Sequence, residues 1–102
     1  MSTKHSVLAK FTEATGLTLI TELSQAFTAL ALSIPSVTCF EAGQNNSPEG
    51  LNHEFTHVFV MTFINAAARD AYLSHPQHLD FVGKLKPCLA NVLVVDYELS
   101  PA

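Results

Sequence analysis

The segment "EFTHVFVMTF", residues 54–63, decides the fold of this chain. Its side chains alternate with period two, which is the repeat of a β-strand. One face carries large apolar groups and a histidine: Phe55, His57, Phe59, Met61 and Phe63. The other face carries threonine and valine: Thr56, Val58, Val60 and Thr62. Because neither face is charged from Phe55 to Phe63, the pattern is typical of a strand that is covered on both sides of its sheet.

Three other segments have strand character. "HSVLAKF", residues 5–11, alternates, and His5 falls among the apolar residues of one face. "SVTCFEAG", residues 36–43, has the composition of a second strand. The last segment, "ANVLVVDYEL", residues 90–99, contains the continuous apolar run Val92 to Val95. A run of this kind again favours burial on both faces of the strand.

Two segments between the strands have helical periodicity. From about Thr15 to Ile34, apolar residues recur at three- and four-residue steps, and Pro35 ends this amphipathic helix. The stripe comprises Leu19, Leu23, Phe27 (or Ala26), Leu30 and Ile34. Asn65 can cap a helix from Ala66 to about Ser74, and Pro76 can open a further short helix as its first residue.

The order of elements is therefore β-α-β-β-α-β, in one domain that spans residues 1–102. This order predicts an α+β, ferredoxin-like sandwich, in which a four-stranded antiparallel sheet carries both helical segments on one face. Since helices cover only one face, the second apolar face of the sheet needs another partner. A second copy of the same sheet is the simplest partner, so the sequence predicts a homodimer.

The composition supports a large covered surface. Hydrophobic residues make up 48% of the chain and charged residues 14%, whereas about a quarter of an ordinary domain is charged. Either another chain or an internal pocket must take up the excess of apolar side chains. The five lysines and arginines are scattered and the net charge is −4, which excludes a basic footprint for nucleic acid or for an anionic membrane.

The sequence favours a soluble, cytoplasmic protein. Its first residues, "MSTKHSVLAKF", lack the apolar core of a signal peptide, and no stretch approaches the ~18 apolar residues of a membrane span. Cys39 and Cys88 lie far apart and in no metal-ligand spacing. We therefore expect two buried thiols in a reducing compartment rather than a disulfide.

Several motifs resemble one known family from end to end of the chain. They are "KHSVLAKF", Pro35-Ser36-Val37, "GQNNSPE", "FTHVFVMTF" and, most specifically, "AYLSHPQHLDF" and "VVDYE". The chain thereby resembles the stress-responsive dimeric α/β-barrel family, often called the Dabb domain. This resemblance implies two ferredoxin-like subunits that pack sheet against sheet as a barrel.

The resemblance also implies a chemistry. Some plant members of the family are polyketide cyclases, which close a linear poly-β-keto chain by an intramolecular aldol condensation without a metal or organic cofactor. In that subgroup the second histidine of the His-Pro-x-His segment acts as base, and the upstream tyrosine assists at a carbonyl. The matching positions here are His78 and Tyr72. Many other members of the family have no assigned reaction.

His78 and Tyr72 also suit these roles on physical grounds. In the short helix that the proline opens, His78 shares an apolar stripe with Phe81 and Leu85, so its side chain should point inward. A neutral imidazole in an apolar wall can accept a proton from an activated carbon acid near neutral pH. The phenol of Tyr72 can donate to a carbonyl oxygen as enolate charge develops.

Three further residues are expected to support this site. His5 and His57 each fall on an otherwise apolar strand face, and Asp96 interrupts the last strand. If these faces coincide, two imidazoles and a carboxylate converge beneath the helices, where the family resemblance places Asp96. Asp96 would then orient an imidazole and would raise the pKa of His78, against the effect of burial. Alternatively, His5 and His57 are hydrogen-bonded core histidines, and Asp96 binds backbone at the barrel rim.

The other histidines have simpler expected roles. We expect His75, directly before the proline, to cap or fill the junction between two helices, and His53 to be solvated in a polar loop. A metal site built from the three supporting residues is conceivable from ligand type. Strands provide no diagnostic ligand spacing, however, and neither a metal nor a cofactor is expected.

The expected pocket is lined by Phe27, Phe59, Met61 and Phe81, and Phe59 and Met61 are large enough to fill it. Three hypotheses of function follow. The chain could be a cofactor-free cyclase or lyase that acts on a polyketide-like β-keto acid, a non-catalytic module that binds a small apolar ligand, or a stress-associated structural homodimer. A pocket that contacts both His78 and Tyr72 favours the first two hypotheses over the third.

Overall fold

The structure is a computed structural model that describes residues 1–100. Its elements follow the predicted order, with the second helical segment divided in two. They are β1 (Thr3–Phe11), α1 (Leu17–Ser33), β2 (Val37–Gln44), β3 (His57–Phe63), α2 (Ala66–Leu73), α3 (Pro76–Leu85), a short 3₁₀ turn η1 (Lys86–Cys88) and β4 (Leu89–Glu98).

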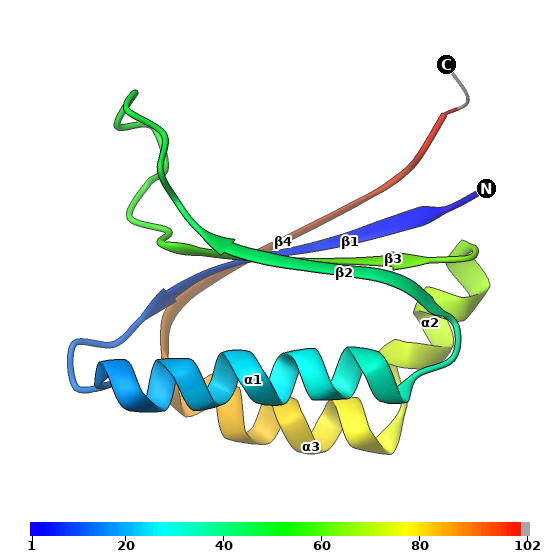
Figure 1. The fold of residues 1–102 in the computed structure, drawn as a ribbon, viewed down its shortest axis with the longest axis horizontal. Helices are drawn as coiled ribbons and strands as arrows, with labels where there is room; N and C mark the ends of the chain where they lie inside the picture. The colour runs from blue at the N-terminus through cyan, green and yellow to red at the C-terminus, as the bar shows by residue number, and fades with distance from the viewer. Residues whose placement is uncertain (101–102) are drawn as a thin grey trace.

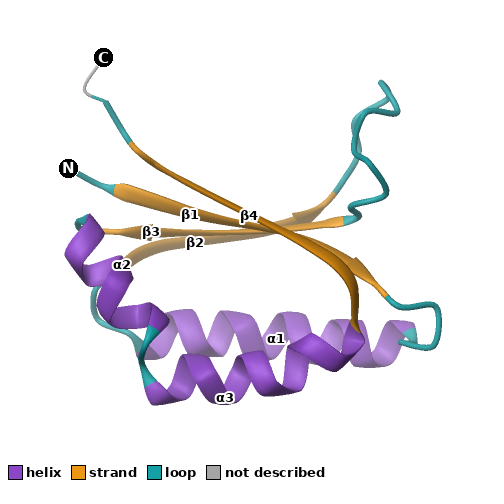
Figure 2. Ribbon diagram, turned by 180° about the vertical axis from the view of Figure 1, so that it is seen from behind, coloured by secondary structure: helices purple, strands orange, loops and turns teal. Residues whose placement is uncertain are grey.

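The four strands form one antiparallel sheet in the order β2-β3-β1-β4. Figures 1 and 2 show that α1, α2 and α3 all lie on one face of this sheet, and that α1 and α3 run side by side. No described segment covers the opposite face (Figure 1). The predicted ferredoxin-like fold is confirmed, and the helices cover one face of the sheet only.

The core fills the space between α1, α3 and the sheet. Burial alternates along β1, and its helix-facing residues pair with those of β3, so that Val7 lies opposite Phe59. The predicted stripe of α1 is wrong at its first member, because Leu19 is 40% exposed while Ile20 packs against the core. Four residues turn an α-helix about 40° more than one full turn. Leu19 lies two such steps before Phe27, so its side chain is rotated off the buried face.

Strand β3 is shorter than its sequence pattern suggests. It begins at His57 rather than at residue 54, because the preceding chain turns. His53 and Glu54 adopt positive φ values of 48° and 69°, which no strand residue has, and the Phe55 amide donates to the Asn52 carbonyl at 2.9 Å. The side chain of His53 is exposed, as predicted.

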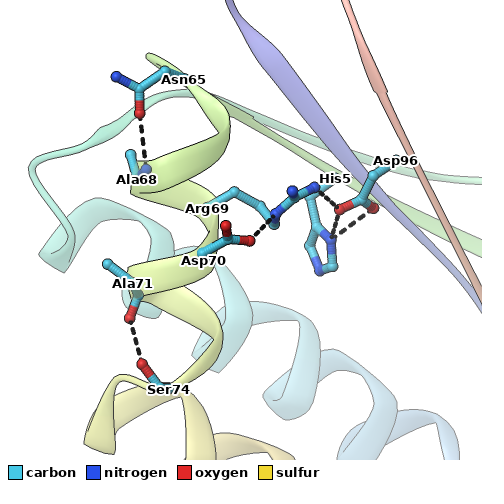
Figure 3. A network of polar contacts seen from close by, with 8 residues as sticks. All are labelled: His5, Asn65, Ala68, Arg69, Asp70, Ala71, Ser74 and Asp96. Atoms are coloured by element: carbon cyan, nitrogen blue, oxygen red, sulfur yellow. Dashed lines mark hydrogen bonds and ion pairs between the residues drawn. The ribbon is translucent and has the colours of Figure 1, made fainter.

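The junction between α2 and α3 is formed by capping groups. The Asn65 side chain accepts from the Ala68 amide at 2.8 Å at the start of α2 (Figure 3). At the start of α3, the His75 side chain accepts from the Gln77 amide at 3.1 Å, and Pro76 occupies the first helical position. The proline therefore breaks the helical segment, and His75 takes the capping role predicted for it.

The uncovered sheet face is apolar in its centre and on β4. The register places Val60 of β3, Ser6 of β1 and Val95 of β4 side by side on this face. Leu93, Val95 and Tyr97 are 44%, 52% and 51% exposed.

The predicted burial of both cysteines is wrong for Cys39. Cys39 is exposed, because it lies on edge strand β2, at a position that the helices do not reach, whereas Cys88 is half-buried. Both thiols are free. Among residues 1–100, no helix has the length and apolar character needed to cross a membrane.

Replacing His75 tests the junction. His75→Ala removes the cap of α3 and should lower the free energy of unfolding by about 1 kcal/mol. His75→Asn retains a capping side chain and should recover most of that loss. Urea denaturation of both variants measures the effect, and a His75→Ala protein as stable as the wild type would show that the cap contributes nothing.

Candidate functional site

A pocket of about 330 Å³ lies between the helices and the β1–β4 half of the sheet. Its wall is mostly apolar, with polar groups contributed by five different elements: β1, α2, α3, η1 and β4. The lining includes His5, Val7, Phe27, Tyr72, His78, Phe81, Val82, Leu85, Lys86, Val92, Val94 and Asp96. The helices leave the edge strand β4 partly open, so the pocket opens beside it. His78 and Tyr72 therefore share one pocket.

His78 is held at its place by the end of the preceding helix. The last carbonyls of an α-helix lack partners within the helix, and the His78 Nδ1–H donates to one of them, Leu73, at 3.0 Å. This bond leaves Nε2 as the unprotonated nitrogen of the neutral ring. Burial lowers the pKa of His78, and electrostatic repulsion from His5 and His75 lowers it further. The hydrogen bond to the Leu73 carbonyl acts in the opposite direction and raises it. The imidazole is therefore neutral at pH 7, as a general base must be.

Tyr72 lies directly beside His78. The centroids of the two rings are 4.4 Å apart, and the Tyr72 side chain is 2% exposed. Burial raises the pKa of its phenol, because the low-dielectric surroundings disfavour a phenolate. Tyr72 therefore stays protonated over the whole physiological range and can act as a hydrogen-bond donor.

A second imidazole reaches the pocket from the sheet. His5 of β1 lies opposite Asp96 of β4, and its Nδ1 lies 2.9 and 3.0 Å from the two carboxylate oxygens. Arg69 of α2 donates to the same carboxylate at 2.8 Å and to Asp70 at 2.8 Å (Figure 3). Asp96 therefore contacts an imidazole, that of His5, and its role as orienter of this ring stays a prediction. We expected Asp96 to raise the pKa of His78. This expectation is wrong, because the two side chains that bind Asp96 are His5 and Arg69.

The sequence patterns did not indicate that Arg69 belongs to this site. It lies three residues before Tyr72, so the two side chains project from the same face of α2 toward the sheet. The signal in the sequence was that Arg69 is a single cation on the inward face of α2, which is otherwise uncharged. Its partner could not be named without the register of β4.

His57 does not join the site, so the predicted convergence of three groups is wrong in this part. The register pairs His5 with Met61 and Ala9 with His57, which separates the two histidines by four strand positions, about 13 Å. Nδ1 of His57 and the Thr56 hydroxyl share a hydrogen bond of 2.8 Å. The His57 ring packs edge-on against Phe11, and burial lowers the pKa of His57. Within residues 1–100, no three histidine, cysteine or acidic side chains gather closely enough to hold a metal ion.

Phe59 and Met61 do not line this pocket, although Phe27 and Phe81 do. Phe59 stacks on Phe27 with ring centroids 4.8 Å apart, and Met61 is almost fully buried in the core. The two residues fill the space beneath α1, next to the pocket. The expectation that they line the pocket is therefore wrong, and the cavity remains open because it lies nearer to β4.

Fold and pocket together define a ferredoxin-like α+β domain with a mostly apolar pocket, lined by two histidines and a tyrosine, between its sheet and its helices. The chain belongs to the Stress responsive A/B Barrel Domain family, whose model matches residues 3–99. It is 34% identical over 95 residues to the stress-response A/B barrel domain-containing protein HS1 of Arabidopsis thaliana, across 93% of this chain and 87% of that protein.

Two solved structures extend the comparison. A dimeric ferredoxin-like protein of unknown function from Jannaschia sp. is 30% identical with a TM-score of 0.85, over 97% of this chain and 100% of that one. The hydroxynitrile lyase of Passiflora edulis has a TM-score of 0.92 at 19% identity, over 99% of this chain and 95% of that one. At that identity the likeness to the lyase concerns the fold alone.

The pKa of His78 tests the geometry of this site directly. We expect His78 to titrate below the usual histidine pKa of about 6.5, because burial disfavours the imidazolium. His5→Gln should raise the pKa of His78, since it removes a nearby positive charge, whereas His57→Gln should leave it unchanged. Two-dimensional NMR of the imidazoles across pH 4–9, roughly the range around the histidine pKa, measures all three proteins. A His78 pKa at or above its usual value would contradict the buried placement.

Proposed function

We propose that this stress-responsive A/B-barrel protein is a homodimer whose pocket performs cofactor-independent acid–base chemistry. Its substrate would be a small, polyketide-like β-keto acid, and the reaction an aldol-type cyclisation or cleavage. The observation that carries the proposal is a neutral imidazole, His78, in contact with a protonated phenol, Tyr72, in the wall of an apolar pocket.

The dimer is supported by the uncovered face of the sheet. Val60 and Val95 are neighbours there, flanked by the exposed Leu93 and Tyr97. Exposed contiguous apolar surface of this kind marks an interaction site. A second copy of the same face matches it in size and character, and the similar Jannaschia protein is dimeric. The free thiols of Cys39 and Cys88 support a reducing, cytoplasmic setting.

Val60→Asp tests the dimer. It places a carboxylate at the centre of the proposed interface, where an unpaired buried charge costs about 3–5 kcal/mol. We expect the variant to sediment as a monomer at micromolar concentration while the wild type sediments as a dimer. Leu32→Asp is the matched control, because Leu32 is 82% exposed on α1 and should leave the dimer unchanged. A dimeric Val60→Asp protein would show that the subunits meet elsewhere.

The chemistry begins with a carbon-bound proton between two carbonyl groups. His78 Nε2 accepts this proton, and the electrons of the C–H bond move into an enolate. The Tyr72 hydroxyl donates a hydrogen bond to the enolate oxygen as its negative charge develops. The enolate carbon can then attack a second carbonyl of the same chain, which forms a carbon–carbon bond and an alkoxide.

The size of the pocket restricts the substrate. A volume of about 330 Å³ is at the low end of the range of about 300–1,000 Å³ for ligand pockets. Phe27 and Phe81, whose ring centroids are 4.8 Å apart, close the pocket on the side of α1. Phe59 stacks on Phe27 from outside the pocket. A short chain with one apolar end therefore fits better than a long polyketide.

The same apolar lining also suits a second function, the binding of a small apolar ligand without turnover. In that case the homodimer would act as a carrier or a stress-associated assembly, and His78 and Tyr72 would only orient a bound carbonyl group. Turnover separates the two functions, because binding alone needs no proton transfer.

Turnover by His78→Ala and Tyr72→Phe tests the proposed reaction. The wild type and each variant are incubated with a panel of short β,δ,ζ-triketo acids and their thioesters, in which the enolate carbon C2 can attack the C7 carbonyl and close a six-membered ring. Loss of a positioned general base should lower the rate about 10²–10⁴-fold in His78→Ala, and Tyr72→Phe should lower it as well. His57→Ala, outside the pocket, should retain activity. Because the pKa of His78 is lowered, the decline of the rate on the acid side should lie below a pH of about 6.5.

Two results would contradict this proposal. If the wild type binds a β-keto acid but converts none of the panel, the binding function replaces the enzymatic one. If His78→Ala lowers the melting temperature strongly and no ligand binds, His78 is a structural residue of the core.

A further inference from the structure

The pocket contains a second imidazole that the proposed reaction has not yet used. We infer that His5 is the proton donor of this site, which protonates the alkoxide oxygen after His78 has removed the carbon-bound proton. This inference rests on the proposed function, and it adds a catalytic group and its support, Asp96 with Arg69, to the site.

The orientation of His5 carries the inference. Its Nδ1 lies within 3.0 Å of both oxygens of Asp96, so Nδ1–H donates to that carboxylate. The two nitrogens of an imidazole point in different directions, and Nε2 is therefore turned away from Asp96. Figure 3 shows the ring extending from β1 with its far edge directed away from the carboxylate. Because His5 is 5% exposed and lines the pocket, Nε2 meets the pocket rather than bulk solvent.

Asp96 is fixed by elements on both sides. His5 holds it from β1, directly opposite in the strand register, and Arg69 holds it from α2 at 2.8 Å. A carboxylate that is bound by two groups from different elements has little freedom to rotate. Asp96 is accordingly a positioning residue, since it contacts the imidazole, and it keeps the His5 ring in one orientation, with Nδ1–H on the carboxylate and Nε2 toward the pocket.

Tyr72 links the two imidazoles. Its ring centroid is 4.4 Å from that of His78 and 6.0 Å from that of His5, so one carbonyl compound can reach all three groups. The two imidazoles have different supports, a backbone carbonyl for His78 and a carboxylate for His5. Asp96 can stay hydrogen-bonded to Nδ1–H of His5 while Nε2 gives up its proton, so the carboxylate holds the ring throughout the transfer.

The proton balance of the aldol step fits this division. His78 Nε2 gains the proton from the broken C–H bond, whose electrons form the new carbon–carbon bond. The π electrons of the attacked carbonyl become a lone pair on oxygen. His5 enters this step as the imidazolium, with protons on both ring nitrogens, transfers its Nε2 proton to that oxygen and becomes the neutral Nδ1–H ring. The product is a β-hydroxy ketone, an isomer of the substrate. His78 then holds one proton more and His5 one fewer, and water exchanges both.

The experiment compares His5→Gln with His57→Gln, which are the same substitution on the same face of the sheet, inside and outside the pocket. With the best-converted acid of the panel, His5→Gln should lower kcat about 10²-fold or more and remove the decline of the rate at high pH. His57→Gln should do neither. Asp96→Asn should lower kcat and shift the His5 ring away from the Nδ1–H tautomer, which ¹⁵N NMR detects. Melting curves check the fold, and His5→Asn is the second variant if His5→Gln unfolds.

The outcomes separate this inference from the proposed function. If the wild type converts the acid and His5→Gln lowers kcat no more than His57→Gln, His5 is not the donor. If His5→Gln lowers kcat but leaves the pH profile unchanged, His5 only positions another group, and the inference is again wrong. If the wild type converts nothing, the proposed reaction itself has failed, and the inference fails with it.

Discussion

The antiparallel pairing of β1 with β4 is the constraint on which the rest of this structure depends. It places His5 opposite Asp96 and Val7 opposite Val94, and so brings the first and last strands of the chain together. Backbone hydrogen bonds set this register, and a shift by one residue would turn every side chain of β4 to the other face. The acid–base groups of the pocket therefore depend on a backbone interaction more than on any single side-chain contact.

Alternation along β4 links the pocket to the proposed interface. Val92, Val94 and Asp96 line the pocket, whereas Leu93 and Val95 belong to the uncovered face. This strand is at the edge of the sheet (Figure 2), and its pocket-lining residues Val92 and Val94 are exposed, so it is the most open wall of the site. In the proposed dimer a second sheet would cover its outer face. Assembly would then restrain Asp96, and through Asp96 the ring of His5.

Local patterns predicted the fold well, and long-range pairing limited the prediction of the site. Period-two and period-3.6 repeats located all four strands and the helices, because burial on one face produces them directly. The placement of His75, Pro76 and Asn65 followed from capping chemistry, which is also local. Strand register decides that Asp96 pairs with His5 and not with His78, and it sets the distance between His5 and His57. The side-chain pattern of a single strand does not contain this register. The family resemblance directed attention to His78 and Tyr72, but it did not indicate Arg69.

The hydrogen bonds of the two pocket histidines fit the proposed chemistry. Within residues 1–100, no histidine nitrogen is a buried side-chain atom without a partner, so neither ring leaves a polar atom sealed in the core. Here the protein engages Nδ1 of His5 through Asp96 and Nδ1 of His78 through Leu73, and both rings line the same cavity. The arrangement fixes each ring from behind and presents the second nitrogen to the pocket. In the proposed chemistry a β-keto compound would meet the two nitrogens differently: its acidic C–H would face the acceptor Nε2 of His78, and its carbonyl oxygen would accept from Nε2–H of protonated His5.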